Sequence, residues 1–593
     1  MAATAPAARG TRRAGSDPAP DGAPASADSA PAGDAAAPDP AGVAEPLDAL
    51  LTDAALGPLR RFLPGRAAAK TAAKLALRPD AVAGRSLRLA AELGKVAVGR
   101  SEVAPDKRDR RFKDPAWAEN FAFRRLMQAY LATGRTVDGL IDDARLDWRS
   151  ERRMRFAAEN VVDALAPTNA PLLNPAALKA AVDTGGRNFA RGSRNFARDM
   201  ARPPRVPSMV DRSAFTVGKN VAATPGAVVL RTPVMELLQY QPSTARVRER
   251  PLLVVPPMIN KYYVADLAPG RSMIEHAVGQ GQQVFAISWR NPDRRHADWD
   301  LDTYAGAVIE ALDAVEVITG SDASHALGLC AGGILLSSVV AVLAARGDAQ
   351  RIAGLSLGVC VLDQRQAGTA GALMDEATAK LAVAGSARRG YLDGRSLAEV
   401  FAWLRPNDLI WNYWVSSYLL GQDPPAFDIL FWNADTTNMP AGLHRDFVRL
   451  ALENALTMPG VARVLDTPVD LSAIAMDTYV VAGIADHITP WTSCYRSVHL
   501  LGSKPRFVLS TSGHIAAMVN PPGNEKATFR VNDALPADAD EWLAGATMAR
   551  GSWWEDWTAW LGERSGDERD APAALGAAGH PPLEPAPGTY VLE

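Results

Sequence analysis

The segment that most constrains the fold of this chain is residues 324–346. A short apolar run ends in residues 328–332 (Gly-Leu-Cys-Ala-Gly), and an apolar segment of helical length begins at once. This is the strand–turn–helix pattern of a nucleophile elbow, in which a reactive side chain occupies a sharp turn at the end of a strand. Gly328 and Gly332 suit such a turn because side chains there would collide with the neighbouring strand and helix. The pattern therefore predicts a nucleophile at Cys330.

Two properties of the helix that follows favour a reactive cysteine. Its amino terminus stabilises a thiolate at Cys330, and the N–H of Ala331 can supply half of an oxyanion hole. The alternative interpretation of Cys330 is a small buried cysteine in a glycine-rich turn. Catalytic partners elsewhere in the chain are needed to favour a nucleophile over this alternative.

Composition excludes several classes of protein. The chain has 593 residues, room for three or four domains at about 150 residues each, and a net charge of −3 that gives no indication of nucleic-acid binding. Its 3 cysteines, Cys330, Cys360 and Cys494, are too few for a disulfide framework and fit a reducing compartment. The longest apolar run, residues 333–345, is shorter than the roughly 20 residues of a membrane span. Arg12-Arg13 is followed by no apolar export segment. We therefore expect a cytoplasmic enzyme.

The chain divides into regions of different pattern. Residues 1–46 are almost entirely Ala, Pro, Gly, Asp and Ser, and we expect this leader to be disordered. Residues 47–213 carry apolar residues at near-helical spacing, interrupted by prolines, and are expected to form a helical N-terminal domain. Residues 364–470 are too long for a plain connection, and we expect a cap (lid) inserted into the core. Residues 571–593 are expected to form an extended tail.

Residues 214–363 and 471–570 are expected to form the two parts of one core. Apolar strands alternate there with helices, which indicates a parallel sheet with right-handed crossovers. The nucleophile follows the third strand of the alternating series, as in an α/β-hydrolase fold. The strands are expected at 227–230, 235–240, 252–255, 284–289, the run into Cys330, 352–362, 478–484 and, as the last, 506–510; the helices are expected at 272–279, about 302–318, the segment after Cys330, and about 490–501.

Aromatic residues gather in two places outside the expected strands. The cap is rich in Trp, Tyr and Phe. These residues either fill the cap's own core or form an apolar wall over the active site or a dimer contact. Trp553, Trp557 and Trp560 recur at helical spacing and indicate one buried face of a helix.

A cysteine nucleophile needs a base, and the base needs an acid that orients it. In this fold the partners follow in the order nucleophile, acid, base. His514 comes directly after the last expected strand, where the base is placed. Three other histidines compete less well: His325, His487 and His499.

The acid is expected at Asp486, just after the strand at 478–484, with Asp363 after the preceding strand as the rival. His487 is interpreted as support for this loop. The second oxyanion donor should come from the loop after strand 252–255, and the Ile259 N–H is the candidate. No metal or redox cofactor is expected, because His and Cys nowhere show ligand spacing.

A series of short stretches then points to one family. They run in order from about residue 109 to the end of the sequence: 109–112 (Asp-Arg-Arg-Phe), 114–117 (Asp-Pro-Ala-Trp), 167–169 (Pro-Thr-Asn), 217–220 (Val-Gly-Lys-Asn), 256–263 (Pro-Pro-Met-Ile-Asn-Lys-Tyr-Tyr), 288–292 (Ser-Trp-Arg-Asn-Pro), 328–333 (Gly-Leu-Cys-Ala-Gly-Gly), 405–413 (Arg-Pro-Asn-Asp-Leu-Ile-Trp-Asn-Tyr), 431–433 (Phe-Trp-Asn), 486–491 (Asp-His-Ile-Thr-Pro-Trp), 512–515 (Ser-Gly-His-Ile), 520–524 (Asn-Pro-Pro-Gly-Asn) and 587–591 (Pro-Gly-Thr-Tyr-Val). Together they resemble the polyhydroxyalkanoate (PHA) synthases, which polymerise 3-hydroxyacyl-CoA into bacterial storage polyester.

The resemblance implies a function and a setting. The catalytic Cys, Asp and His of these synthases fall on Cys330, Asp486 and His514, and the length favours the single-subunit type. The family's substrate is a CoA thioester, and the resemblance implies a homodimer at the surface of cytoplasmic polyester granules, with granule-coat proteins as candidate partners. The cap is more similar to that of medium-chain synthases than to that of short-chain ones.

The chemistry explains a cysteine where a hydrolase would carry serine. Moving an acyl group from CoA to Cys330 exchanges one thioester for another, so the acyl group stays activated for transfer to a hydroxyl. Two alternatives remain: a thioesterase or polyester depolymerase of the same fold, and a non-catalytic granule-coat protein.

Overall fold

The computed structural model describes residues 66–107, 109–201, 204–364, 376–404 and 406–593. The leader expected at residues 1–46 lies outside these residues. Within them, no helix is both long and apolar enough to cross a membrane.

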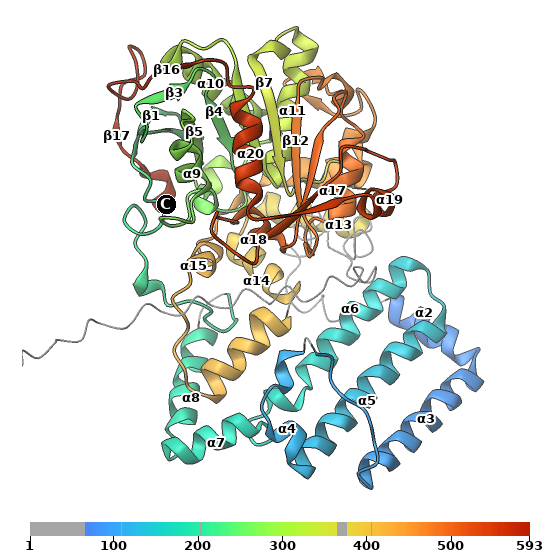
Figure 1. Ribbon diagram of the computed structural model, residues 1–593. Helices are drawn as coiled ribbons and strands as arrows, with labels where there is room; N and C mark the ends of the chain where they lie inside the picture. The colour runs from blue at the N-terminus through green and yellow to red at the C-terminus, as the bar shows by residue number, and fades with distance from the viewer. Residues whose placement is uncertain (1–65, 108, 202–203, 365–375, 405) are drawn as a thin grey trace, which may run out of the picture. The chain divides into compact units, whose positions relative to one another are not determined.

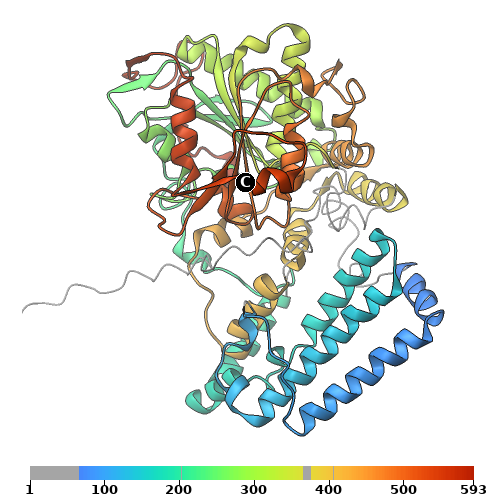
Figure 2. The same ribbon diagram turned by 45° about the vertical axis from the view of Figure 1, so that its right-hand side comes forward.

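The first described part of the chain is helical, as the spacing of its apolar residues predicts. Helices α3 and α5 lie side by side in Figures 1 and 2, and the Arg85 guanidinium on α3 bonds Asp143 on α5 at 2.7 Å. Asn120 and Asp147 accept bonds from first-turn N–H groups and so set where α5 and α6 begin. The elements are α2 (Arg66–Ala76), α3 (Pro79–Ala97), η2 (Arg110–Phe112), α4 (Ala116–Glu119), α5 (Phe121–Ala144), α6 (Trp148–Ala164), η3 (Pro167–Asn169), α7 (Pro175–Thr184), α8 (Arg187–Met200) and η4 (Arg212–Ala214).

The rest of the chain is built on a mixed sheet. Among the described residues its order is β15-β14-β13-β12-β7-β6-β4-β5-β2-β1-β17. The strands from β13 to β5 are parallel to one another, and those at both edges are antiparallel. This arrangement confirms the expected α/β-hydrolase fold. The strands are β1 (Gly226–Arg231), β2 (Met235–Tyr240), β4 (Leu252–Val255), β5 (Val284–Trp289), β6 (Ser324–Leu329), β7 (Ile352–Gly358), β12 (Thr478–Gly483), β13 (Arg506–Ser510), β14 (Thr528–Val531), β15 (Thr547–Arg550) and β17 (Glu584–Pro585); β3 (Arg246–Arg248) and β16 (Glu568–Asp570) form a separate pair.

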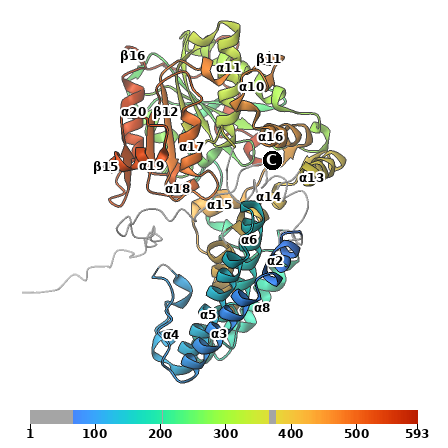
Figure 3. The same cartoon turned by 90° about the vertical axis from the view of Figure 1, so that its right-hand side faces the viewer.

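Helices cover both faces of this sheet. In β4 all four residues are buried, and alternate side chains enter different cores. Leu253 and Val255 belong to the core that includes residues of α10, α11 and α17, whereas Leu252 and Val254 belong to the core that includes residues of α9 and α20. Figure 3 shows α20 and α11 on opposite sides of β12. The helices are α9 (Met273–Gly279), α10 (Leu301–Thr319), α11 (Ala331–Arg346), α17 (Trp491–Val498), α18 (His514–Met518), α19 (Ala539–Ala544) and α20 (Trp553–Gly562), with the short turns η5 (Tyr262–Val264), η6 (Arg294–His296), η7 (Ala349–Arg351) and η12 (Tyr590–Leu592).

Helix α20 buries its tryptophans, as the spacing predicts. Trp553 and Trp557 are each 1% exposed, and Trp554 between them is equally buried. The indole N–H groups of Trp553 and Trp554 donate to the carbonyls of Ala517 and Met518, at 2.6 and 2.9 Å. Buried indole N–H groups need such acceptors, and here the acceptors are the last residues of α18. Helix α20 therefore fixes the short helix that begins at His514.

Two strand predictions are wrong. The strand expected at 352–362 ends at Gly358, because Val359 has a left-handed backbone (φ 46°), and the Leu362 N–H donates to the Ser497 hydroxyl instead of to a strand. The apolar run continues because these residues are buried between helices. The strand at 506–510 is not the last, since β14 and β15 extend the sheet beyond it; most of their residues are half-buried or exposed, so they show no continuous apolar run.

The inserted region between β7 and β12 is largely helical. Its elements are α13 (Glu376–Arg389), β8 (Tyr391–Leu392), α14 (Gly394–Leu404), the π-helical turns η8 (Asn407–Trp411) and η9 (Trp414–Leu419), α15 (Asp428–Ala434), β9 (Met439–Pro440), α16 (Ala441–Glu453), η10 (Ala455–Thr457), β10 (Arg463–Val464), β11 (Thr467–Pro468) and η11 (Leu471–Ala473). The prediction of a large insertion at this point of the fold agrees with this order.

One part of the insertion, η8 and η9, contacts the N-terminal helices. The Asn188 amide donates to the Leu419 carbonyl at 2.8 Å, and the Tyr418 hydroxyl donates to the Asp199 carboxylate at 3.0 Å. A Cβ at Gly192 would lie 1.8 Å from the Tyr418 carbonyl oxygen, so α8 and η9 approach as closely as backbones can. These residues form one packed unit despite their separation in the sequence.

Candidate active site

Cys330 lies on a strained turn between β6 and α11. Its backbone has φ 49° and ψ −119°, a conformation that L-residues rarely adopt, and its N–H donates to the Gly358 carbonyl of β7 at 2.8 Å. The side chain is 9% exposed. This is the geometry of a nucleophile elbow, since the turn lifts one side chain out of the sheet at the start of a helix.

The glycines around Cys330 are required by close backbone contacts. A Cβ at Gly328 would lie 2.6 Å from the Cα of Gly333. A Cβ at Gly332 would lie 2.4 Å from the Val255 carbonyl oxygen. The prediction that side chains at these two positions would collide with their neighbours is therefore confirmed. The contact at Gly332 also shows that the start of α11 lies against the end of β4.

His514 and Asp486 form a buried hydrogen-bonded pair. The His514 Nδ1 lies 2.7 Å from Asp486 Oδ2, and both side chains are buried. Gly483 and Ser510, the last residues of β12 and β13, are paired in register. The two side chains therefore come from loops at the same end of adjacent strands. This explains how residues 28 positions apart meet.

Charges at the site determine the protonation of His514. Burial alone would lower its pKa, but the Asp486 carboxylate and the Cys330 side chain, through charge and hydrogen bonds, together raise the pKa of His514 to about 10. The pKa of Asp486 is lowered, because the charge of His514, together with hydrogen bonds from His514 and Thr489, outweighs the effect of burial. The favoured state is therefore an imidazolium between a carboxylate and the Cys330 sulfur.

Thr489 is a site residue that the sequence reasoning missed. Its hydroxyl donates to Asp486 Oδ2 at 2.6 Å and lies 3.1 Å from His514 Nδ1. Its N–H, like that of Ile488, donates to Asp486 Oδ1. The signal was present in the Asp-His-Ile-Thr stretch, because an Asp side chain commonly accepts from N–H groups two and three residues later. His487 is half-buried in the same loop, but the hydroxyl that touches both members of the pair belongs to Thr489.

The rival residues lie in other environments. Asp363 accepts a bond from the Asn454 amide at 3.0 Å and lies 4.0 Å from the Arg496 guanidinium. His325 is fully buried in β6, with its ring near that of Trp560 on α20. His499 follows α17 and packs edge-on against the Tyr495 ring. Among these acids and bases, the structure brings His514 and Asp486 together with Cys330.

The loop expected to complete an oxyanion hole lies beside the elbow. Ala331 is the first residue of α11, so its N–H has no acceptor within the helix. Pro256, at the start of the loop, has its carbonyl oxygen 2.6 Å from where a Gly332 Cβ would lie. The Ile259 N–H in this loop stays the predicted second donor. Within the described part of the chain, no group of three or more His, Cys, Asp or Glu could hold a metal ion.

Comparison with known proteins identifies the family. Residues 108–277 match the family described as "Poly-beta-hydroxybutyrate polymerase (PhaC) N-terminus", and residues 262–521 match "alpha/beta hydrolase fold". Poly(3-hydroxyalkanoate) polymerase 1 of Ectopseudomonas oleovorans is 47% identical over 502 residues, which cover 85% of this chain and 89% of the relative. Polymerase 2 of the same organism is 45% identical over 506 residues, covering 85% and 90%.

A third relative gives the same result. The poly(3-hydroxyalkanoate) polymerase subunit PhaC of Cupriavidus necator is 44% identical over 503 residues, which cover 84% of this chain and 85% of the relative. Because these likenesses extend over most of both sequences and include the elbow, the chain is an enzyme that belongs to the poly(3-hydroxyalkanoate) polymerase family.

Proposed function

We propose that this chain transfers the acyl group of a (R)-3-hydroxyacyl-CoA to Cys330 and then to the hydroxyl end of a polyester, releasing CoA. The observation that carries the proposal is the buried His514–Asp486 pair facing a cysteine on a strained elbow. Such a cysteine, with a paired base and an adjacent helix amino terminus, is equipped for acyl transfer.

The first step is acylation. The Cys330 thiolate attacks the thioester carbonyl, and the resulting oxyanion is bound by the N–H groups of Ala331 and Ile259. The bond from the carbonyl carbon to the CoA sulfur then breaks, and the His514 imidazolium gives its proton to that sulfur. The products are an acyl-Cys330 thioester and free CoA thiol.

The second step lengthens the chain. The 3-hydroxyl oxygen of another acyl unit attacks the Cys330 thioester while His514 takes the hydroxyl proton. An oxoester forms, and the Cys330 thiolate leaves. Asp486 holds the imidazole in orientation and stabilises its charged form in both steps, with Thr489 fixing Asp486. Neither step requires a metal or a redox cofactor.

The burial of the site suits a transferase. Water would hydrolyse the acyl-Cys330 intermediate, and both Cys330 and His514 are less than a tenth exposed. The cytoplasmic location at granule surfaces, the granule-coat partners and the homodimer are part of the same proposal and rest on the family resemblance.

The test measures CoA release and acyl product together. Wild type, Cys330→Ala and the control Gly306→Ala, at a position where an added Cβ meets nothing within 4 Å, are supplied with 3-hydroxybutyryl-CoA and 3-hydroxydecanoyl-CoA. We expect polymer from wild type and the control, and none from Cys330→Ala. Free hydroxy acid as the sole acyl product would indicate a thioesterase, and CoA release unaffected by Cys330→Ala would exclude Cys330 as the nucleophile.

A further inference from the structure

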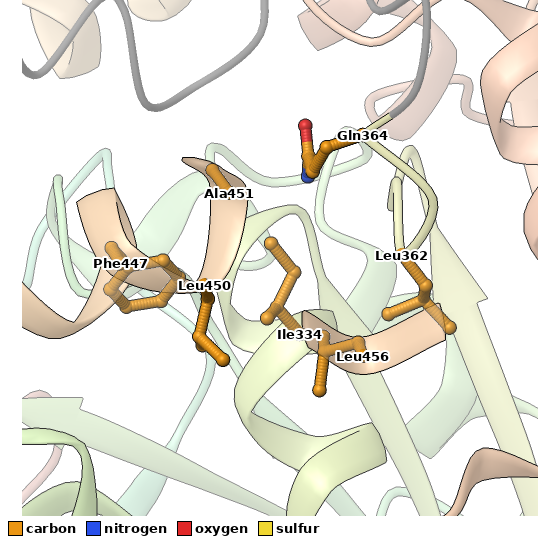
Figure 4. Close-up of a pocket in the computed structure, with 7 residues that line it drawn as sticks. All are labelled: Ile334, Leu362, Gln364, Phe447, Leu450, Ala451 and Leu456. Carbon is orange, nitrogen blue, oxygen red and sulfur yellow. The ribbon is translucent and has the colours of Figure 1, made fainter. Parts of the chain in front are cut away.

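A small cavity of about 20 Å³ lies between the core and the insertion. Its walls come from three separate parts of the chain: the first turn of α11, the segment after β7, and the α16–η10 region. Figure 4 shows side chains from all three around one space. The residues used below are Ile334, Leu362, Leu450, Ala451 and Gln364.

Two walls of the cavity are linked directly to the nucleophile. Ile334 stands one helical turn after Cys330, and its N–H bonds the Cys330 carbonyl at 3.4 Å. Leu362 follows β7, whose last residue, Gly358, accepts the Cys330 N–H. Two walls of the cavity therefore belong to the two segments whose backbones bond the backbone of Cys330.

The lining of the cavity selects for alkyl groups. Six of the seven lining residues are apolar. The exception, Gln364, has its amide bonded to the Val361 carbonyl at 3.1 Å and its N–H bonded to Asn454 at 2.8 Å. A charged CoA fragment, an ester or a hydroxyl would lose its hydrogen bonds to water there. Of the parts of a 3-hydroxyacyl group, only the alkyl substituent on the third carbon has no polar atom.

The size of the cavity limits that substituent. A cavity needs roughly 10–15 Å³ by this measure to hold one water molecule, so about 20 Å³ accommodates a group about as large as a methyl.

We propose that this cavity receives the alkyl substituent of the acyl group on Cys330, and that it makes 3-hydroxyacyl groups with short substituents the preferred monomers. This inference rests on the function proposed above. Wild type should release CoA from 3-hydroxybutyryl-CoA with a kcat/KM about tenfold or more above that for 3-hydroxydecanoyl-CoA, because longer chains do not fit. The similarity of the cap to medium-chain synthases favours the opposite ratio. This measurement therefore decides whether the enzyme prefers short substituents, as the cavity indicates, or longer ones, as the cap similarity indicates.

Helix α16 offers a matched pair of substitutions. Leu450 lines the cavity and is half-buried, whereas Leu452 on the same helix is 41% exposed and does not line it. Leu450→Ala should enlarge the cavity and raise the ratio of kcat/KM for 3-hydroxyhexanoyl-CoA over 3-hydroxybutyryl-CoA by about tenfold or more. Leu452→Ala should leave this ratio within about twofold, by the same reasoning.

A filling substitution tests the same cavity in the other direction. Ala451 lines it and is half-buried, so Ala451→Leu should lower kcat/KM for 3-hydroxybutyryl-CoA while thermal unfolding stays close to that of wild type. Polymer from wild type with an unchanged substrate ratio in both Leu450→Ala and Ala451→Leu would overturn the cavity proposal and leave the polymerase function standing. Absence of polymer from wild type with every substrate would overturn the proposed function, and the cavity proposal with it.

Discussion

Replacing Gly332 by alanine should inactivate the site through a displacement of at most about an ångström. The added Cβ would lie 2.4 Å from the Val255 carbonyl oxygen and 2.6 Å from that of Pro256. Both atoms belong to the backbone, so no side chain can rotate away. To reach 3.0 Å, below which real Cβ atoms essentially never come, α11 and the end of β4 must separate by 0.6 Å, and an ordinary contact of 3.4 Å requires 1.0 Å.

This separation acts on catalysis and on stability by different routes. It pulls the Ala331 N–H on α11 away from the Ile259 N–H in the loop after β4, and a misplacement of about 1 Å can lower a rate by about 10²-fold. Overpacking of a tight core contact typically costs about 1–3 kcal/mol. We therefore expect kcat to fall by roughly two orders of magnitude and the free energy of unfolding to fall by about 2 kcal/mol.

Gly306 provides the matched control. It lies inside α10, and an added Cβ would have nothing within 4 Å, so Gly306→Ala should keep full activity and gain up to about 1 kcal/mol from better helix propensity. CoA release gives kcat, and urea unfolding gives the stability. If Gly332→Ala kept the wild-type kcat and stability, the steric reasoning about the elbow would be refuted.

Three further substitutions probe the hydrogen bonds and charges at the active site and the contact between η9 and α8. The pKa of His514 is raised to about 10 from an unfolded value of about 6.5. Its protonation therefore stabilises the fold fully below about pH 6.5, and this stabilisation is lost as the pH rises towards 10. Urea unfolding across this range should show a smaller loss of stability for Asp486→Asn than for wild type, and an equally steep loss would contradict the assignment. Thr489→Val removes the hydroxyl bonded to Asp486, so kcat for CoA release should fall about tenfold, the equivalent of about 1.4 kcal/mol. Thr489→Ser should restore the wild-type kcat, and failure of serine to do so would show that loss of the hydroxyl does not cause the fall. Tyr418→Phe removes the bond to Asp199 and should lower the free energy of unfolding by about 1 kcal/mol with kcat unchanged, whereas a large loss of kcat would mean that this contact also shapes the active site.

The central strands and the elbow could be predicted because their signals are local. The run Leu252–Val255 is apolar throughout since both faces of β4 are covered, and Gly328 is required by a contact with Gly333 in the same turn. Strands β14 and β15 could not be predicted in this way, because a strand with one exposed face and no clean alternation resembles a loop.

The order of the candidate catalytic residues along the chain could be predicted from the sequence, but the hydrogen bonds and the cavity around them could not. The order of Cys330, Asp486 and His514 along the chain follows the fold, so each could be placed after a strand. The bond from the Thr489 hydroxyl depends on a loop conformation that spacing alone does not specify. The cavity depends on Leu450 lying near Ile334, more than 100 positions away in the sequence, which requires knowledge of how the insertion packs.

The contact between α8 and η9 has a consequence for building chimaeric enzymes from this family. A boundary near residue 213 separates the two along the sequence, but Asn188 and Asp199 on one side hold Leu419 and Tyr418 on the other. Exchange of the N-terminal helices alone would pair α8 of one parent with η9 of another, at a place where a single Cβ at Gly192 cannot be accommodated. Residues 407–419 should therefore be exchanged together with the N-terminal helices, so that both segments come from the same parent although they are separated in the sequence.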